Sequence, residues 1–248
     1  MKENLAAEEE FNPIDNIITP RLKLIADLIE KEESVLDLGT DHGYLPVYLR
    51  TGGNNSKIIL SDISKASLKK AKHNCRMLTP SKSFDFRQGN GLKIIKKGEV
   101  DDIVIAGIGG NLMTDILGRD LAKARAAKKL ILQPRTAQGR LRQWLIKKGF
   151  GIKEEHLVKE GRFICEVIVA SYFQEIDEEM QIDAHGDSIL WEMPSWLVKQ
   201  GGGLLREYIE AKLERERRIL RSMGNSKNIT KQDLAAVEEN IRYLESCK

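Results

Sequence analysis

Apolar residues over positions 1–150 follow two alternating patterns. Short runs rich in Ile, Val and Leu, typical of buried strands, end in polar residues or glycine. These predicted strands cover residues 34–38, 57–63, 83–88, 101–107 and 128–134. Segments with helical spacing separate them, near residues 20–29, 44–50, 64–77, from 111 onward and 138–148. The alternation predicts a parallel sheet with helices on both faces and right-handed crossovers.

Residues 150–173, FGIKEEHLVKEGRFICEVIVASYF, depart from this alternation. Two strand-like runs flank the turn signal KEGR, which predicts a β-hairpin. The hairpin can insert one antiparallel strand into the sheet, which a plain dinucleotide-binding fold lacks. We therefore expect residues 1–173 to form an α/β domain with a Rossmann-like sheet and a closing antiparallel hairpin.

Residues 174–248 form a second predicted unit, of mixed composition up to the glycines at 201–203. Two apolar stripes with helical spacing follow: Leu205, Ile209, Leu213, Leu220 and Met223, then Leu234, Val237, Ile241 and Leu244. The sequence GNSKN at 224–228 separates the stripes, which predicts two helices packed antiparallel in coiled-coil style. The first helix is rich in arginine, with acids interleaved: Arg206, Arg215, Arg217, Arg218 and Arg221. A solvated helix pair and a contact with RNA both remain open as interpretations of these charges.

The stretch VLDLGTDHGYLP, residues 35–46, carries distinctive groups at the end of the first predicted strand. Gly39 and Gly43 allow backbone amides to approach a ligand, and Asp37 can reach a cationic amino group. Asp41 and His42 stand where a nucleotide-binding loop usually keeps small residues. We expect a ligand at this edge, because open α/β sheets bind ligands beyond the carboxyl ends of their strands.

Three further strand ends carry groups suited to the same ligand. Asp62 can accept hydrogen bonds from two ribose hydroxyls, although it could instead cap the helix beginning near Ser64. In QGNG, residues 88–91, the Asn90 amide offers donors and an acceptor to an adenine edge. The glycines of AGIGG, residues 106–110, leave room for a second substrate. The predicted cofactor-binding residues are Asp37, Gly39, Asp41, Asp62, Ile63, Gly89, Asn90, Gly91 and Gly107.

Two cofactors compete for this site. A dinucleotide requires G-x-G-x-x-G and amides that cradle a pyrophosphate, whereas this loop reads GTDHGY. Asp41 would repel a pyrophosphate, which disfavours an NAD-dependent dehydrogenase. S-adenosylmethionine has no phosphate and carries a cationic sulfonium and a cationic amino group, which carboxylates in the loop would attract. The residues therefore favour S-adenosylmethionine.

The charge distribution indicates the kind of substrate better than the net charge of +3 does. Residues 121–148 contain nine Lys or Arg and no acid, which is typical of a surface that faces a polyanion. A helix surface that is basic without such a role is the alternative. The basic residues are Lys123, Arg125, Lys128, Lys129, Arg135, Arg140, Arg142, Lys147 and Lys148.

Length and composition bound the remaining possibilities. The 248 residues, 41% of them hydrophobic, suffice for one sizeable core and an appendage. The sequence shows neither an apolar run of the ~18–20 residues that a membrane helix needs nor a secretory signal, so we expect a cytoplasmic protein. Cys75, Cys165 and Cys247 lie far apart and are expected to be reduced thiols without disulfide or metal roles. The oligomeric state is not fixed by the sequence, and a monomer is the simplest expectation.

Together, the blocks LDLGTDHGYLP, QGNGL, IAGIGG, LILQP and CEVIVA, with the C-terminal helix pair, resemble the bacterial tRNA (adenine-N1)-methyltransferase family that acts on position 22 of tRNA. The resemblance extends from about Arg21 to the end of the chain. It implies a class I methyltransferase domain (1–173), a C-terminal helical coiled-coil domain (174–248), S-adenosylmethionine as methyl donor and tRNA as substrate. The tRNA-binding residues would then come from the basic segment: Lys123, Arg125, Lys128, Lys129, Arg135, Arg140 and Arg142.

Two positions depart from the pattern of the family. QGDGL is the commoner form of the second block, so Asn90 replaces an acid but can still accept a hydrogen bond from the adenine amino group. Arg135 stands where Asn commonly follows LQP, and it could add a phosphate contact. IAGIGG also replaces the NPPY-like tetrad of amino-directed methyltransferases, which fits attack by a ring nitrogen.

The reaction that the resemblance implies suggests which residues carry the chemistry. Adenine N1 has a lone pair at neutral pH, and its methylation leaves the base cationic. Asp41 is the first candidate to stabilise that charge, and His42 is a candidate for contact with the target base. Hydrogen bonds that stabilise the loop are the alternative role of both side chains.

Two other functions remain open from the residues alone. The first is a class I methyltransferase that acts on another RNA site, a small molecule or a protein, although the basic segment and helical appendage argue against a small substrate. The second is a non-catalytic RNA-binding module with a vestigial donor site.

Overall fold

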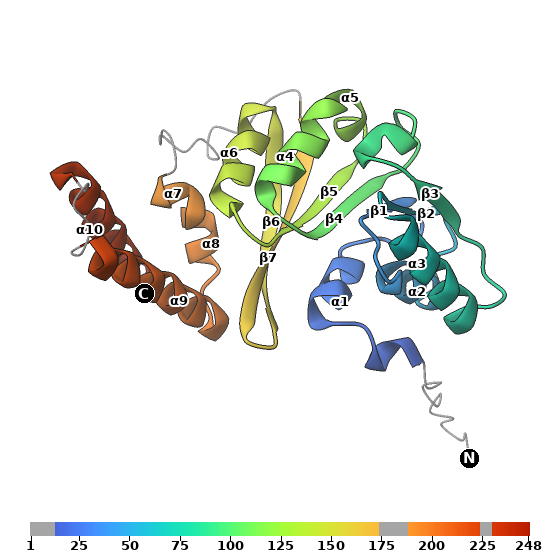
Figure 1. The fold of residues 1–248 in the computed structure, drawn as a ribbon, viewed down its shortest axis with the longest axis horizontal. Coiled ribbons are helices and arrows are strands. Elements are labelled where there is room, and N and C mark those ends of the chain that lie inside the picture. The colour runs from blue at the N-terminus through green and yellow to red at the C-terminus, as the bar shows by residue number, and fades with distance from the viewer. Residues whose placement is uncertain (1–12, 174–187, 224–229) are drawn as a thin grey trace, which may run out of the picture.

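The structure is a computed structural model that describes residues 13–173, 188–223 and 230–248. A seven-stranded sheet crosses the molecule in the order β3-β2-β1-β4-β5-β7-β6 (Figure 1). Strands β1 to β5 are parallel, and β7 lies antiparallel between β5 and β6. The strands are β1 (Val35–Leu38), β2 (Ile58–Asp62), β3 (Asp85–Gln88), β4 (Asp102–Ile108), β5 (Lys129–Pro134), β6 (Phe150–Glu160) and β7 (Phe163–Tyr172). The predicted α/β class, the five parallel strands and the closing hairpin are confirmed.

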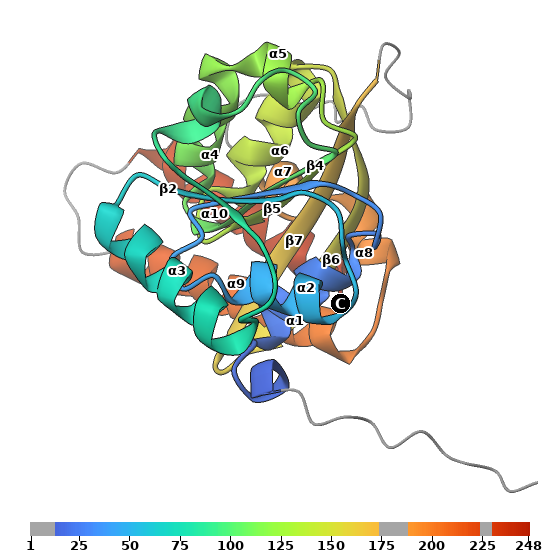
Figure 2. The same cartoon turned by 90° about the vertical axis from the view of Figure 1, so that its right-hand side faces the viewer.

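Helices cover both faces of the sheet (Figure 2). One face carries η1 (Pro13–Asn16), α1 (Pro20–Asp27), α2 (Tyr44–Thr51) and α3 (Lys65–Leu78). The other carries η2 (Gly91–Ile94), α4 (Gly110–Arg119), α5 (Leu121–Ala124) and α6 (Gln138–Lys147). Successive side chains of a strand point to opposite faces. Val35 therefore packs under α1, α2 and α3, and Leu36 packs under α4, α5 and α6. Burial on both faces explains why the strands read as continuous apolar runs.

Local capping explains where two of these helices begin. Pro20 occupies the first turn of α1, and the Thr19 hydroxyl accepts a hydrogen bond from the Leu22 amide at 3.4 Å. Ser64 caps α3 in the same way, since its hydroxyl accepts from the Ser67 amide at 3.2 Å. The predicted cap at Ser64 is confirmed, and Asp62 lies two residues before that cap.

The C-terminal segment packs on the closing hairpin. It comprises α7 (Ile189–Glu192), α8 (Ser195–Lys199), α9 (Gly203–Met223) and α10 (Lys231–Ser246). Glu216 of α9 contacts Asn240, while Glu210 contacts Lys248, so α9 and α10 run in opposite directions. The predicted antiparallel pair is confirmed, and the predicted break at 224–228 lies outside the described residues.

A third hydrophobic cluster joins these helices to the sheet. Leu205, Ile209 and Leu213 of α9 are buried together with Leu244 of α10. Leu157 and Ile164 of the hairpin pack against the same cluster, so the helix pair is seated on the β6–β7 hairpin. None of the helices in the described part of the chain is long and apolar enough to cross a membrane.

Candidate functional site

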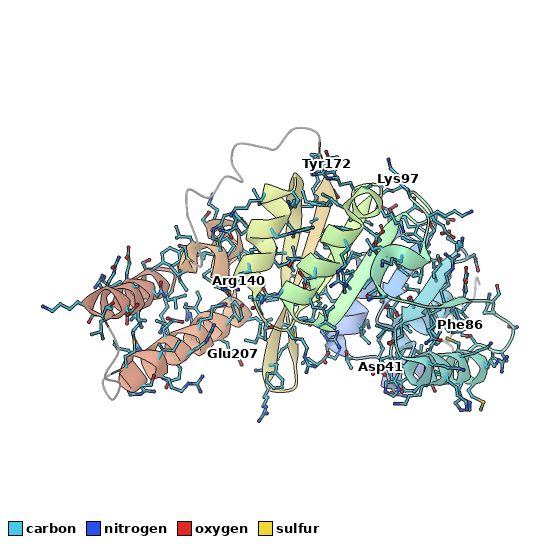
Figure 3. All side chains as sticks on the ribbon, turned by 45° about the horizontal axis from the view of Figure 1, so that its top comes forward. Asp41, Phe86, Lys97, Arg140, Tyr172 and Glu207 are labelled. Atoms are coloured by element: carbon cyan, nitrogen blue, oxygen red, sulfur yellow. The ribbon has the colours of Figure 1, made fainter. Side chains whose placement is uncertain are left out.

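A cavity of about 650 Å³ opens at the carboxyl ends of β1, β4 and β5. Its walls come from the loop after β1, the ends of β4 and β5, the start of α1 and the tip of the β6–β7 hairpin. Strands β1 and β4 are neighbours whose following helices lie on opposite faces, which is where open α/β sheets bind ligands. Figure 3 shows Asp41 at this edge of the sheet and Tyr172 at the opposite edge.

The loop after β1 is held open by its backbone. The amides of Gly39 and Thr40 donate to the Ser61 carbonyl at 2.7 and 3.1 Å, which fastens the loop to β2. Gly39 has φ of 82° and Gly107, at the end of β4, has φ of 79°. A Cβ at either position would meet no heavy atom of the described residues within 4 Å. Both glycines therefore provide a left-handed turn and free space beside the cavity.

Asp37 forms the acidic floor of the cavity. It is 6% exposed, and burial raises the pKa of its carboxyl to about 6. The nearby Asp62 raises this pKa further, while the neighbouring Thr40 side chain and the charge of Arg21 oppose the rise. A cation bound in the cavity would relieve the cost of this buried charge.

Asp41 and His42 lie at the mouth of the cavity. The Asp41 Oδ2 and His42 Nε2 atoms are 3.5 Å apart, and both side chains are largely exposed. The His42 ring stacks on Tyr44 with centroids 5.3 Å apart and planes 11° apart. Within the described residues, the Asp41 carboxylate has no hydrogen bond to a backbone amide, so the predicted loop-stabilising role finds no support. Asp41 also has φ of 44°, an uncommon conformation for a non-glycine residue that often marks functional loops.

The remaining predicted cofactor residues lie outside the cavity, along the same edge of the sheet. Asp62 and Gln88 are partners in the β2–β3 register, which places Ile63 and Gly89–Gly91 just beyond these strands. Asp62 Oδ1 accepts from the Ser64 amide at 2.7 Å, so one of its oxygens is occupied by a local turn. Ile63 is 68% exposed, an apolar side chain open to a ligand.

Most of the cavity residues were not predicted from the sequence, and Gln133, Arg21 and Glu160 are the charged or amide side chains among them that hold its walls together. The buried Gln133 accepts from the Gly107 amide at 3.0 Å and from Arg21 Nη1 at 3.1 Å. Arg21 also pairs with Glu160 of the hairpin at 3.4 Å. These contacts fix the end of β4, the start of α1 and the hairpin tip relative to one another. A polar side chain inside the apolar run LILQP is the one sequence signal for Gln133.

The residues of the basic segment divide between two edges of the sheet instead of forming one continuous surface, and their role in facing a polyanion stays a prediction. Strand β5 begins at Lys129 and ends at the cavity, so Lys128 and Lys129 lie at the far edge of the sheet. The residues at or near that edge have local partners: Lys123 with Asp120, Lys128 with Asp101, Lys129 with Glu33, and Arg125 over the Tyr172 ring. Folding separates these residues because β5 runs from the far edge of the sheet to the cavity and α6 (Gln138–Lys147) runs back again.

Arg142 is a second correction. It is fully buried, so it cannot contact tRNA in this conformation. Its guanidinium pairs with Glu155 and Glu166 and donates to the Trp191 carbonyl at 2.9 Å. Glu166 also accepts from the Tyr208 hydroxyl. Arg142 therefore fastens α6 to the hairpin and to the C-terminal helices.

Arg135 lies at the edge of the cavity, and Arg140 lies in a neighbouring cleft. Arg135 lines the cavity and also a second cleft of about 730 Å³ between the start of α6 and helices α7, α9 and α10. Arg140, Lys212 and Arg215 line this cleft as well. Two of the seven predicted tRNA-binding residues are thus placed beside the candidate site, and α9 contributes two further cations.

The strand order, the antiparallel β7 and the acidic, glycine-lined cavity define the class I methyltransferase architecture. A family model described as a methyltransferase domain matches residues 18–168, and the chain belongs to this family. The fold and the residues of the cavity agree with that membership.

Three comparisons describe what the chain resembles. The tRNA (adenine(22)-N(1))-methyltransferase of Bacillus subtilis is 35% identical over 153 residues, which cover 62% of this chain and 64% of that protein. The crystal structure of the B. subtilis m1A22 tRNA methyltransferase TrmK has a TM-score of 0.79 and 27% identity, covering 93% of this chain and 98% of that one. The Streptococcus pneumoniae protein Sp1610, in complex with S-adenosyl-L-methionine, has a TM-score of 0.77 and 24% identity, covering 93% and 99%. The first two matches confirm the resemblance inferred from the sequence. The third match shows that the two proteins share a fold.

Proposed function

We propose that this chain transfers a methyl group from S-adenosylmethionine to N1 of an adenine in tRNA, at position 22. The observation that carries the proposal is the acidic cavity at the ends of β1, β4 and β5, which has cations on its outer rim. The similarity of the chain to the B. subtilis tRNA (adenine(22)-N(1))-methyltransferase supports the choice of adenine 22 as the target.

The residues at this edge fit S-adenosylmethionine. Gly39 and Gly107 leave room for close backbone approach, and the carboxyls of Asp37 and Asp41 suit a ligand with an ammonium and a sulfonium. Asp62 keeps one carboxylate oxygen outside its local turn for ribose hydroxyls, while Ile63 and Asn90 flank the place of an adenine. When bound, this cofactor supplies an electrophilic methyl group.

The protein's contribution to the reaction is mainly orientation. Adenine N1 already has a lone pair, so the cavity must hold the base in line with the methyl group, and good alignment can supply ~7–11 kcal/mol. Methylation leaves the base with a positive charge. The exposed Asp41 carboxylate at the mouth of the cavity would stabilise that charge as it develops. His42 would lie beside the same base.

We further propose that residues 1–173 act as the catalytic domain and residues 174–248 as a helical domain that helps to hold tRNA. The cleft shared by Arg135, Arg140 and Arg215 lies between the two and suits phosphate groups. Arg142 joins the two domains at the Trp191 carbonyl, and its partner Glu166 accepts a hydrogen bond from Tyr208 of the helical domain.

Methyl transfer to purified tRNA, followed by nucleoside analysis, tests the proposed function. We expect 1-methyladenosine, and its loss when position 22 is changed from adenine. Another methylated nucleoside would overturn the assignment. A parallel titration with S-adenosylmethionine and NAD separates a methyltransferase from a dehydrogenase, because only the first ligand should bind.

A further inference from the structure

The tip of the β6–β7 hairpin is a feature that the proposed reaction does not explain. The hairpin extends beyond the carboxyl edge of the parallel strands, between α1 and α9 (Figure 1). Gly161, with φ of 60°, and Arg162 form the turn, and Phe163 begins β7. Phe163 lines the candidate cavity together with Asp41 and His42. The hairpin thus places an aromatic side chain at the entrance through which a target base must pass.

Phe163 is mostly uncovered. It is 60% exposed, although a phenylalanine ring normally stabilises a fold by being buried. The next residue, Ile164, packs against the C-terminal hydrophobic cluster, so the strand register directs Phe163 to the other side. The Arg162 guanidinium lies 5.0 Å from the centre of the Phe163 ring. An exposed aromatic ring with a cation on one side is suited to a nucleobase and its phosphate.

The tip is anchored on both sides. Glu160 pairs with Arg21 of α1 at 3.4 Å, while Lys159 pairs with Glu207 of α9 at 2.7 Å. Figure 3 shows Glu207 beside the hairpin. Glu160 and Phe163 are also partners in the β-ladder, so the pairing continues to the turn. These contacts hold the turn, and with it Phe163, in one position relative to α1 and α9.

We propose that Phe163 is a wedge that enters the base stack of the tRNA at the place left by the extruded target adenine, with Arg162 against the adjacent phosphate. This inference rests on the proposed function. Adenine N1 lies on the Watson–Crick edge, so a paired target must leave its stack, which costs a few kcal/mol. A base inside the cavity would leave most of the Phe163 ring uncovered, and the ring can then stack on the bases outside.

The test compares Phe163→Ala, Phe163→Trp and Met77→Ala with the unmodified full-length chain. Met77 is 68% exposed at the end of α3, away from the cavity, so it controls for loss of an exposed apolar side chain. Each protein is assayed for methyl transfer to tRNA and for S-adenosylmethionine affinity. Each is also mixed with tRNA that carries 2-aminopurine at position 22, whose fluorescence rises when the base leaves the stack.

We expect Phe163→Ala to lower kcat/KM for tRNA by roughly 10- to 100-fold, the range for loss of one base–aromatic stack. It should also abolish the fluorescence rise while cofactor affinity stays unchanged. Phe163→Trp should preserve both signals, and Met77→Ala should match the unmodified chain. Equal kcat/KM and equal fluorescence for Phe163→Ala and the unmodified chain would overturn the wedge.

The two proposals fail in different ways. An unmodified chain that forms no 1-methyladenosine refutes the proposed function. The fluorescence is read without methyl transfer, so it still reports whether Phe163 opens the stack.

Discussion

Arg142 Nε lies 2.8 Å from Glu155 Oε1, and both side chains are fully buried. The contact joins α6, which begins beside the candidate cavity, to the middle of β6. Glu155 also accepts from the Trp196 indole at 2.9 Å, so the same carboxylate reaches α8. The sheet and the C-terminal helices therefore share one buried charge network.

Replacement of Arg142 by alanine should destabilise the fold strongly. It would leave Glu155 and Glu166 buried without their cation, and breaking a buried pair in this way typically costs ~3–5 kcal/mol. Chemical denaturation measures the free energy of unfolding. Lys147→Ala on the exposed part of the same helix is the matched control, with an expected change within about 0.5 kcal/mol. Equal stability of the two variants would show that the network contributes little.

Asp41→Asn should remove most methyl transfer and leave the fold intact. Asparagine tolerates the positive φ of this position, so the substitution removes the charge with little backbone strain. Loss of one charge-stabilising group typically lowers kcat by about 10²–10³-fold. Single-turnover methylation measures the effect, and a circular dichroism melt checks the fold. Near-normal turnover would remove Asp41 from the catalytic residues.

Most of the fold could be predicted from the sequence because its signals are local. Apolar runs, the Ser64 cap and the KEGR turn each act within a few residues, and they locate every strand of the sheet. Helices α5, α7 and α8 were not predicted. Each has four or five residues, too few for periodic spacing to show.

The candidate site could be predicted only in part. Strand ends converge in any parallel sheet, so Asp37, Asp41 and Gly107 were placed correctly at one edge. The contact between Arg21 and Gln133 joins residues 112 positions apart, and no local pattern encodes it. The basic segment misled for a related reason: closeness in sequence says little about closeness in space when β5 and α6 each cross the sheet.

Asp37→Asn should stabilise the protein at alkaline pH while it weakens cofactor binding. Folding raises the pKa of the Asp37 carboxyl from 3.8 to about 6, so the folded state holds this proton more tightly than the unfolded state. The contribution of the protonated Asp37 carboxyl to the free energy of unfolding is fully present below pH 3.8 and is lost as the pH rises to about 6. At pH 8 the buried carboxylate therefore costs at most about 3 kcal/mol.

Denaturation at pH 8 and at pH 4 tests this trade-off. Asparagine carries no charge, so the variant should be the more stable protein at pH 8, and the difference should shrink toward pH 4. The affinity of the unmodified chain for S-adenosylmethionine should also fall as the pH drops below about 6. A variant that is less stable at pH 8, or one that binds the cofactor normally, would contradict this role of Asp37.

The double variant Arg135→Ala/Arg140→Ala should bind tRNA more weakly and with a smaller salt dependence. Both residues line the cleft between the sheet and the C-terminal helices, whereas Lys147 and Lys148 lie at the other end of α6. Each lost phosphate contact should reduce the slope of log K against log salt by about 1, so we expect a change of about 2.

Lys147→Ala/Lys148→Ala is the matched control, because it also removes two positive charges, at the other end of α6. Titrations from low to high salt, read by filter binding, should leave its slope unchanged. If the control lowers the slope and the arginine variant does not, the tRNA lies along the far edge of the sheet. That edge also carries Lys128 and Lys129, so such a result would restore the basic segment as the RNA surface and remove the cleft from it.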